Sequence, residues 1–339
     1  MKTVHQALPT YGRGLFSTLD ESLFGRCVVY TAPEPWAEIE SSFPAEPLAV
    51  TVPATMERKD IERLIDGQPQ ANAVFGVGGG TACDAAKLHA FRRGARLVLV
   101  PTILSVDAPY TKAVGIRVGG RVRYVGEVYP DYLLVDFDLL ERSPKRLNRA
   151  GVGDVLSIFT ALFDWNLARD VRGESYDHGI ATDSQALLNR LLASAEAVRA
   201  CGEEGLRLIS ELYVAEVALC ERFGNSRPEE GSEHYFAYAV ESDTRRHFIH
   251  GELIACAVLL TGLRQGQDVT AVKAFLDECG VAYRPKEIGL SYREMEKTLC
   301  ALPSFLAAET QLPYGIYHHR DIDKSAARAL VASFRELFE

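Results

Sequence analysis

The chain has no apolar run that reaches the roughly 18 residues that a membrane-spanning helix needs. Its first residues, MKTVHQALPTYGRG, lack the apolar core of a secretory signal peptide. It also lacks a basic excess, because 37 lysines and arginines face 46 aspartates and glutamates and leave a net charge of −9. An acidic excess argues against binding along a nucleic-acid backbone and against adsorption to an anionic bilayer. We therefore expect a cytoplasmic protein that binds neither nucleic acid nor membranes.

Cysteine is scarce, and its pattern excludes several kinds of site. The seven cysteines form no CxxC motif and lie scattered along the chain, at Cys27, Cys83, Cys201, Cys220, Cys256, Cys279 and Cys300. An odd, scattered set indicates reduced thiols rather than disulfides or a thiolate metal site. The ligands of any metal must then be sought among histidines and carboxylates.

The first part of the chain alternates β-rich runs with helical patterns. The runs lie at 26–31, 48–53, 72–78, 95–102 and 133–136. Continuous apolar runs of this kind are typical of parallel strands buried on both faces. Because helical patterns separate several of them, the order predicts an open, doubly wound α/β sheet.

The character of the sequence changes after residue 142. Ser143 followed by Pro144 is a helix-start signal, and from there apolar residues recur at three- and four-residue spacing. At 339 residues, two domains are expected. We predict a nucleotide-binding α/β domain over 1–142, an all-helical domain over 143–339, and a ligand cleft between them. The pair Gly119-Gly120 between two β-rich runs further predicts a hairpin in the first domain.

A glycine-rich turn joins a predicted strand to a predicted helix in VFGVGGGTACDAAK. Gly78, Gly79 and Gly80 have no Cβ, so a ligand can approach the backbone closely. The N–H groups that open the next helix face outward, where they favour an anion such as a diphosphate. Thr81 stands where a strict GxGxxG motif has its last glycine, so a tight turn without a ligand remains the alternative.

The loop that follows the next strand, in VPTILSVDAPYT, is rich in hydroxyl groups. Thr102, Ser105 and Asp107 lie beyond the end of that strand. In an open α/β sheet, loops at the carboxyl ends of the strands line the ligand crevice. The loop is therefore placed to contact a nucleotide and a polar substrate, although an ordinary turn has the same composition.

Two histidines in GSEHYFAYAVESDTRRHFIHGEL are candidates for a metal site. His234 and His250 stand 16 residues apart. A catalytic metal needs about three protein ligands and an open position, and Asp154 is available just after a glycine-containing turn. Alternatively, Asp154 is a helix N-cap, His234 a surface residue and His250 a helix-start residue.

Four segments, taken together, resemble a known family. GGGTACDAAK, PTILSVDAP, GVGD…DW and SEH…HGEL occur in order within residues 25–265. They are similar to segments of the metal-dependent polyol dehydrogenases of the iron-containing alcohol dehydrogenase superfamily, such as glycerol and sn-glycerol-1-phosphate dehydrogenases, with dehydroquinate synthase more distant. The resemblance implies a Rossmann-like N-terminal domain followed by a helical C-terminal domain, the dehydroquinate synthase-like fold.

The resemblance also implies roles for particular residues. Asp154, His234 and His250 are expected to bind one divalent metal, with zinc favoured over iron or nickel. Asp107 is expected at the nicotinamide end, beside the substrate hydroxyl. The residues expected to contact NAD or NADP are Gly78, Gly79, Gly80, Thr81, Asp84, Thr102 and Ser105.

Two positions depart from the family pattern. Tyr238 stands where relatives often carry a second histidine, so it is expected to take over a catalytic role unless His247 does. Ala32 stands where NAD-preferring relatives place an aspartate for the adenosine ribose, with Glu34 nearby. The choice between NAD and NADP therefore stays open.

The leading hypothesis is an NAD(P)-linked, metal-dependent oxidoreductase that interconverts a small polyol or polyol phosphate and its ketone, and that forms a homo-oligomer. One alternative is a sugar-phosphate cyclase of the dehydroquinate synthase type, which uses NAD transiently. GSEHYFAYA lacks the asparagine and the second histidine of such cyclases. The other is a nucleotide-binding protein that has lost catalysis, which only Tyr238 encourages.

Overall fold

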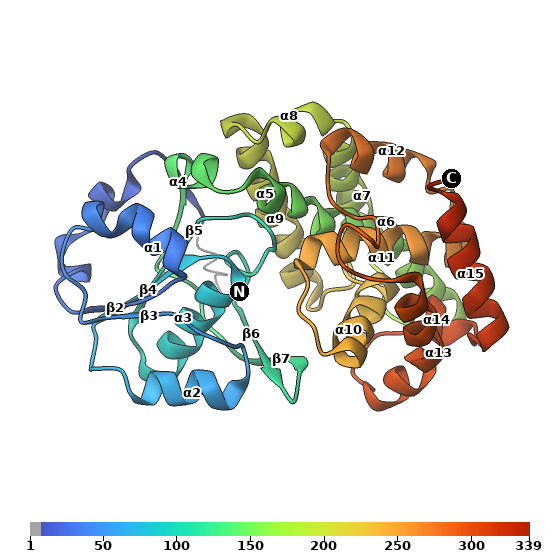
Figure 1. The fold of residues 1–339 in the computed structure, drawn as a ribbon, viewed down its shortest axis with the longest axis horizontal. Helices are drawn as coiled ribbons and strands as arrows, with labels where there is room; N and C mark the ends of the chain where they lie inside the picture. The colour runs from blue at the N-terminus through green and yellow to red at the C-terminus, as the bar shows by residue number, and fades with distance from the viewer. Residues whose placement is uncertain (1–7) are drawn as a thin grey trace. The chain divides into compact units, whose positions relative to one another are not determined.

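The computed structural model describes residues 8–339, which form two compact units (Figure 1). The first comprises the described residues up to Asn148 together with Cys201–Ser210, and the second comprises Arg149–Ala200 and Glu211–Glu339. Part of the signal-peptide prediction falls on residues 1–7 and so lies outside the described residues. Among residues 8–339, no helix combines the length and the hydropathy needed to cross a bilayer.

The first unit is built on a parallel sheet of six strands in the order β1-β8-β5-β4-β2-β3. Every residue of β4 is buried, as expected of a strand covered on both faces. Phe24, Phe43 and Phe75 pack against one another in the core of this unit. The strands are β1 (Thr10–Gly12), β2 (Cys27–Tyr30), β3 (Ala49–Thr51), β4 (Ala73–Gly78), β5 (Arg96–Pro101) and β8 (Tyr132–Asp136).

Helices and one hairpin complete the first unit. The antiparallel pair β6 (Ala113–Val118) and β7 (Arg121–Glu127) turns at Gly119-Gly120, where both glycines have positive φ. The helices up to the division are η1 (Leu15–Thr18), η2 (Glu21–Leu23), α1 (Pro33–Ile39), η3 (Glu40–Ser42), α2 (Arg58–Asp66), α3 (Gly80–Arg93), α4 (Phe137–Arg142) and α5 (Lys145–Ala150), which crosses it.

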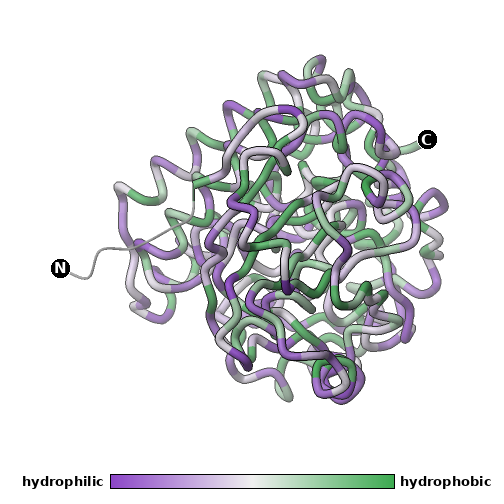
Figure 2. The backbone as a smooth tube through the Cα atoms, turned by 90° about the vertical axis from the view of Figure 1, so that its left-hand side faces the viewer, coloured by the Kyte–Doolittle hydropathy of each residue, from purple (hydrophilic) through white to green (hydrophobic). Residues whose placement is uncertain are grey.

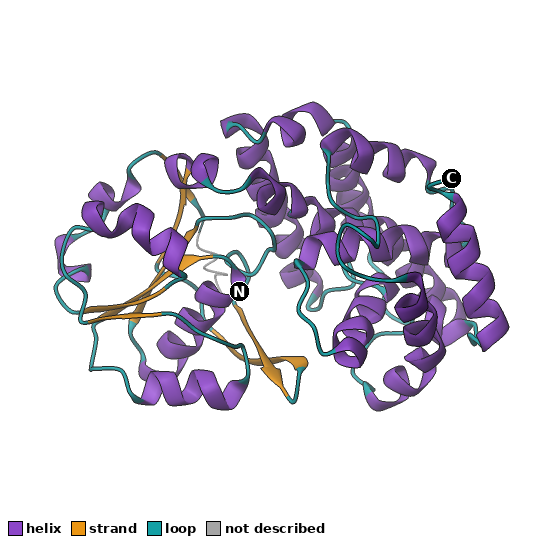
Figure 3. Ribbon diagram, in the orientation of Figure 1, coloured by secondary structure: helices purple, strands orange, loops and turns teal. Residues whose placement is uncertain are grey.

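The regular structure of the second unit, residues 149–200 and 211–339, consists of helices joined by loops, and every strand of the described chain lies in the first unit (Figure 3). Hydrophilic and hydrophobic residues alternate along much of the backbone tube in Figure 2. The helices are α6 (Val152–Arg172), α7 (His178–Leu192), α8 (Ala195–Ala200), α9 (Glu203–Phe223), α10 (Ser232–Thr244), α11 (His250–Gln265), α12 (Thr270–Cys279), α13 (Tyr292–Ala308), α14 (Ile316–His319) and α15 (Lys324–Glu336).

The predicted fold class is confirmed, and so are the five predicted strands and the hairpin. The sequence did not predict β1, a strand of three residues that pairs with β8 at the edge of the sheet. It also did not predict that Cys201–Ser210, at the start of α9, belongs to the first unit. The division after Asn148 lies close to the boundary predicted at residue 142.

Candidate active site

Three side chains predicted as metal ligands converge in the second unit. Asp154 lies in the first turn of α6, His234 is the third residue of α10, and His250 is the first residue of α11. One ligand atom from each lies within 4.8 Å of the others. Asp154 is not an N-cap, because Gly151 occupies that position, and His234 is not a surface residue, because it is 6% exposed.

Two glycines bring α6 and α11 close enough for this convergence. A Cβ on Gly153 would stand 2.2 Å from the carbonyl oxygen of Gly251 and 2.5 Å from its Cα, so only glycine fits there. Gly153 precedes Asp154, and Gly251 follows His250. The contact therefore places the side chains of Asp154 and His250 side by side, with His250 Nε2 3.3 Å from Asp154 Oδ1.

The three candidate ligands differ in their exposure to solvent. Asp154 and His234 are buried, whereas 32% of the side chain of His250 is exposed. The imidazole rings of His234 and His250 lie with centroids 5.4 Å apart. A catalytic metal requires such an arrangement, because substrate must reach a position that the protein ligands leave vacant.

The charges around His234 favour a cation. Burial lowers the pKa of His234, but Glu230, Glu233 and Asp154 outweigh burial and raise that pKa to about 9. A site that holds a proton so firmly is also attractive to a divalent ion, since the same carboxylates stabilise either positive charge. His234 Nδ1 lies 2.8 Å from Glu233 Oε1, so the neutral ring keeps the lone pair on Nε2. One carboxylate and two imidazoles are a donor set that suits zinc.

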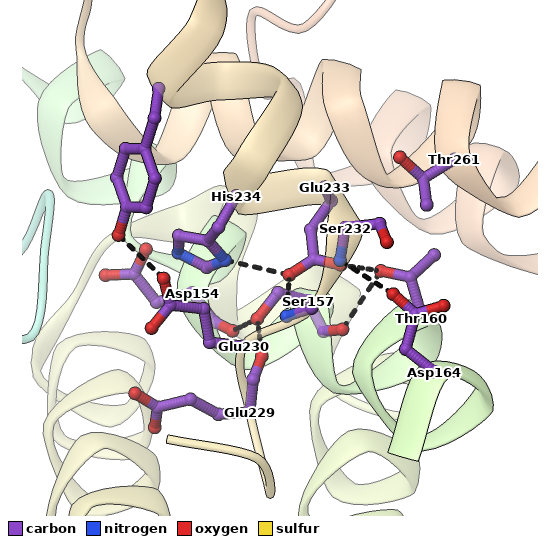
Figure 4. Close-up of polar contacts among 12 residues, drawn as sticks. Asp154, Ser157, Thr160, Asp164, Glu229, Glu230, Ser232, Glu233, His234 and Thr261 are labelled. Carbon is purple, nitrogen blue, oxygen red and sulfur yellow. Dashed lines mark hydrogen bonds and ion pairs between the residues drawn. The ribbon is translucent and has the colours of Figure 1, made fainter. Parts of the chain in front are cut away.

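A buried polar network lies beside the candidate metal ligands (Figure 4). Asp164 Oδ2 accepts a hydrogen bond from the amide of Ser232 at 2.8 Å, and Asp164 Oδ1 accepts from the amide of Ile316 at 2.9 Å and from Gln265 Nε2 at 3.0 Å. Burial raises the pKa of Asp164 to about 6 although Ser232 and Gln265 oppose the shift by hydrogen bonding. These bonds fix the starts of α10 and α14 against α6.

Tyr238, the predicted catalytic tyrosine, lies one helical turn after His234. Its hydroxyl donates a hydrogen bond of 2.8 Å to Glu230 Oε1. The ring centroids of Tyr238 and His234 are 5.8 Å apart. His247, the other residue considered for this role, is exposed in the segment between α10 and α11.

The glycine-rich turn forms the junction of β4 and α3. Gly78 has φ of 153°, a value that side chains disfavour. A Cβ on Gly79 would stand 2.8 Å from Ile103, and a Cβ on Gly80 would stand 3.0 Å from Val106. The turn therefore packs against the loop after β5. No side chain caps the start of α3, and uncapped amides at a helix start are able to bind an anion.

The remaining predicted cofactor residues differ in accessibility. Thr81 is exposed in the first turn of α3. Thr102 is 5% exposed and donates its amide to Gly78, whereas Ser105 and Asp107 are half-buried. Asp84 lies deeper, and its Oδ1 contacts Lys87 Nζ at 2.8 Å and the amide of Gly115 at 3.2 Å. Burial raises the pKa of Asp84, and Lys87 opposes that shift.

Comparison with known proteins adds independent information. A family model described as iron-containing alcohol dehydrogenase matches residues 36–144. The glycerol-1-phosphate dehydrogenase [NAD(P)+] of Sulfurisphaera tokodaii is 31% identical over 247 residues, which cover 72% of this chain and 70% of that protein. The enzyme of the same name from Hyperthermus butylicus is 34% identical over 230 residues, which cover 67% and 65%. The chain belongs to the iron-containing alcohol dehydrogenase family.

Solved structures confirm the fold of this family member. Glycerol dehydrogenase from Schizosaccharomyces pombe matches with a TM-score of 0.72 at 17% identity, covering 97% of this chain and 88% of that one. A probable glycerol dehydrogenase from Sinorhizobium meliloti matches with a TM-score of 0.71 at 19% identity, covering 97% and 96%. These matches concern the fold; the family predicted from four short motifs is confirmed by the match to the family model and by the relatives that are 31% and 34% identical.

Sequence reasoning missed the acidic residues around the family's candidate metal ligands. Glu230, Glu233 and Asp164 were not singled out, because a buried acid carries no signature of its own in one sequence. Two features of the sequence could have indicated them. Glu233 directly precedes His234, and Asp164 is an acidic residue within the largely apolar helix α6.

Proposed function

We propose that this family member is an NAD(P)-linked, metal-dependent oxidoreductase that interconverts a small polyol or polyol phosphate and its ketone. The observation that carries the proposal is the convergence of Asp154, His234 and His250 within 4.8 Å. The names of the relatives, glycerol-1-phosphate dehydrogenase [NAD(P)+], support a substrate of the glycerol 1-phosphate type.

The first unit would bind the dinucleotide at the junction of β4 and α3. The uncapped amides of α3 and the glycines Gly78, Gly79 and Gly80 suit a diphosphate. Thr81, Thr102 and Ser105 would add hydroxyl contacts. Asp84 would act from behind this surface, because Lys87 and the amide of Gly115 already engage its carboxylate.

The second unit would hold one divalent cation on Asp154, His234 and His250. Such a cation supplies Lewis acidity toward a hydroxyl or carbonyl oxygen, and the nicotinamide cofactor carries the hydride. The burial of Asp154 and His234 would limit the access of water to these two ligands. The exposed side of His250 leaves an approach for substrate.

Proton movement would use Tyr238. Its Oη donates to Glu230 Oε1 at 2.8 Å, so a proton lost from the tyrosine hydroxyl has an acceptor already in place.

Asp107, on the loop after β5, would contact the substrate hydroxyl at the nicotinamide end of the cofactor. We also propose zinc as the cation, a cytoplasmic location and a homo-oligomer, and either nicotinamide as the cofactor.

The test combines elemental analysis with a substrate screen. The purified protein is analysed for divalent metals and then assayed with glycerol, glycerol 1-phosphate, cyclic polyols and sugar phosphates against NAD and NADP, and with dihydroxyacetone phosphate against NADH and NADPH. We expect about one metal per chain and net NAD(P)H formation from a polyol or polyol phosphate. Product formation from a sugar phosphate without net reduced nicotinamide would instead identify a cyclase, and tight cofactor binding without any turnover would identify a protein that has lost catalysis.

A further inference from the structure

Glu233 is a fully buried carboxylate in the first turn of α10, directly before His234. Its Oε1 accepts hydrogen bonds from His234 Nδ1 at 2.8 Å and from the amide of Gly231 at 2.6 Å. Its Oε2 accepts from Thr160 Oγ1 at 2.6 Å. Figure 4 shows the carboxylate of Glu233 facing the imidazole of His234. The side chain is therefore held from both oxygens and presents one of them to the ring.

The hydrogen bond from His234 decides which ring nitrogen is free. Because Nδ1–H points at a carboxylate, the lone pair of the neutral ring is on Nε2. Histidines that bind metals commonly donate their other N–H to a carboxylate, which fixes the tautomer, orients the ring and makes the ligand more basic. Thr160 in turn fixes Glu233, since its hydroxyl comes from the neighbouring helix α6, two turns after Asp154.

The charge of Glu233 calls for a cation nearby. Within residues 8–339, no lysine or arginine makes an ion pair with Glu233, and its one ionisable partner is His234. A second buried acid, Asp164, lies nearby. The two carboxylates are close enough for the charge of Glu233 to help raise the pKa of Asp164. A buried carboxylate is stable only when hydrogen bonds and a positive charge compensate it. A divalent ion bound to the ring of His234 would supply that charge when the ring itself is neutral.

We propose that Glu233 is a positioning residue of the cation site. It orients the ring of His234 so that Nε2 is available to the ion. It also places a negative charge next to His234, on the side of the ring away from the ion. This inference rests on the proposed function, because it requires that Asp154, His234 and His250 bind a divalent cation. A purely structural role as a cap for α10 is the competing explanation, since Glu233 also accepts from the amide of Gly231.

Two substitutions separate charge, orientation and capping. In Glu233→Gln, the amide oxygen can still accept from His234 and Gly231, and the amide nitrogen can donate to Thr160 Oγ1, so only the charge is removed. Glu233→Ala removes the charge and all three hydrogen bonds. Val272→Ala is the matched control, because it truncates a buried residue of α12, a helix without candidate metal ligands.

The affinity of each metal-free protein for Zn²⁺ and Co²⁺ is measured by competition with a chelator, together with the visible spectrum of the Co²⁺ complex and the thermal unfolding midpoint. We expect Glu233→Gln to keep the wild-type midpoint and spectrum while its affinity falls about 10- to 100-fold. Glu233→Ala should lose more affinity and show an altered spectrum, because the ring is no longer oriented. Val272→Ala should lower the midpoint and keep the affinity.

Wild-type affinity and spectrum in Glu233→Ala would overturn the positioning role while leaving the proposed function intact. Affinity that falls in step with the midpoint in all three variants, Val272→Ala included, would show that Glu233 is only a cap. If the wild-type protein itself binds neither ion, the proposed function fails and the positioning role fails with it.

Discussion

Replacing Gly153 by alanine tests the geometry that creates the site. The added Cβ would stand 2.2 Å from the Gly251 oxygen, while real Cβ contacts essentially never fall under 3.0 Å, so the backbones must separate by at least 3.0 − 2.2, or about 0.8 Å. Both glycines adjoin a candidate metal ligand, because Gly153 precedes Asp154 and Gly251 follows His250. A functional site tolerates displacement of only about 0.5 Å, so the substitution should disturb the site.

The size of the effect follows from two opposing contributions. Alanine has a higher helix propensity than glycine, which favours the variant by up to about 1 kcal/mol. Forcing an extra methyl group into a packed contact costs about 1–3 kcal/mol, and the upper end applies because the contacted atoms belong to the backbone. We therefore expect a net loss of about 1–2 kcal/mol in the free energy of unfolding, and a fall in zinc affinity on the order of 10- to 100-fold.

Denaturant unfolding of the metal-free protein measures the free energy of unfolding, and competition with a chelator measures the zinc affinity. Gly25→Ala serves as the control, since a Cβ at Gly25 meets nothing within 4 Å and the backbone there lies outside the left-handed region. A Gly153→Ala protein that is as stable as the control and binds zinc like the wild type would refute the argument that this contact sets the positions of Asp154 and His250.

Further variants test other parts of the account. His250→Ala should retain the fold by circular dichroism, lose the bound metal, and show an activity lower by several orders of magnitude. Full activity in a metal-stripped variant would contradict the role of His250. Asp107→Ala should lower kcat by about 10²-fold and leave the Kd of the cofactor nearly unchanged; an unaltered rate with every polyol would remove Asp107 from the site. Burial, together with nearby arginines, lowers the pKa of His89 from 6.5 to about 4. Between pH 6.5 and pH 4 the unfolded chain therefore binds more protons than the folded one, and stability is lost as the pH falls through this range. We expect this loss to reach about 3 kcal/mol below pH 4, because one pKa unit corresponds to about 1.4 kcal/mol. His89→Gln should flatten the pH dependence of unfolding relative to the control His178→Gln at an exposed site, and identical curves for the two variants would exclude the effect.

Much of the fold was predictable because its signals are local. The buried strands β4 and β5 are continuous apolar runs, and such runs indicate a parallel sheet whatever surrounds them. Strand β1 was missed because its three residues, TYG, carry no alternation or apolar run and pair only with the distant β8. The return of residues 201–210 to the first unit is likewise a tertiary effect, because the helical pattern of α9 continues through them.

The candidate site was only partly predictable for a similar reason. The motifs around Asp154, His234 and His250 indicated a ligand set through resemblance, whereas the residues that support those ligands are identified by contacts across helices. Thr160 is 73 residues from Glu233, and Gln265 is 101 residues from Asp164. Similarly, only the packed structure shows why position 153 must be glycine, because the atom that excludes a side chain there belongs to Gly251.

The most direct test of the central claim is X-ray absorption at the zinc edge of the zinc-loaded protein. We predict a cation bound by two imidazoles and one carboxylate, with nitrogen and oxygen ligands at about 2.0–2.2 Å and the rest of the coordination from solvent. Sulfur ligands at about 2.3 Å, or a spectrum without imidazole scattering, would contradict the claim that Asp154, His234 and His250 form the metal site.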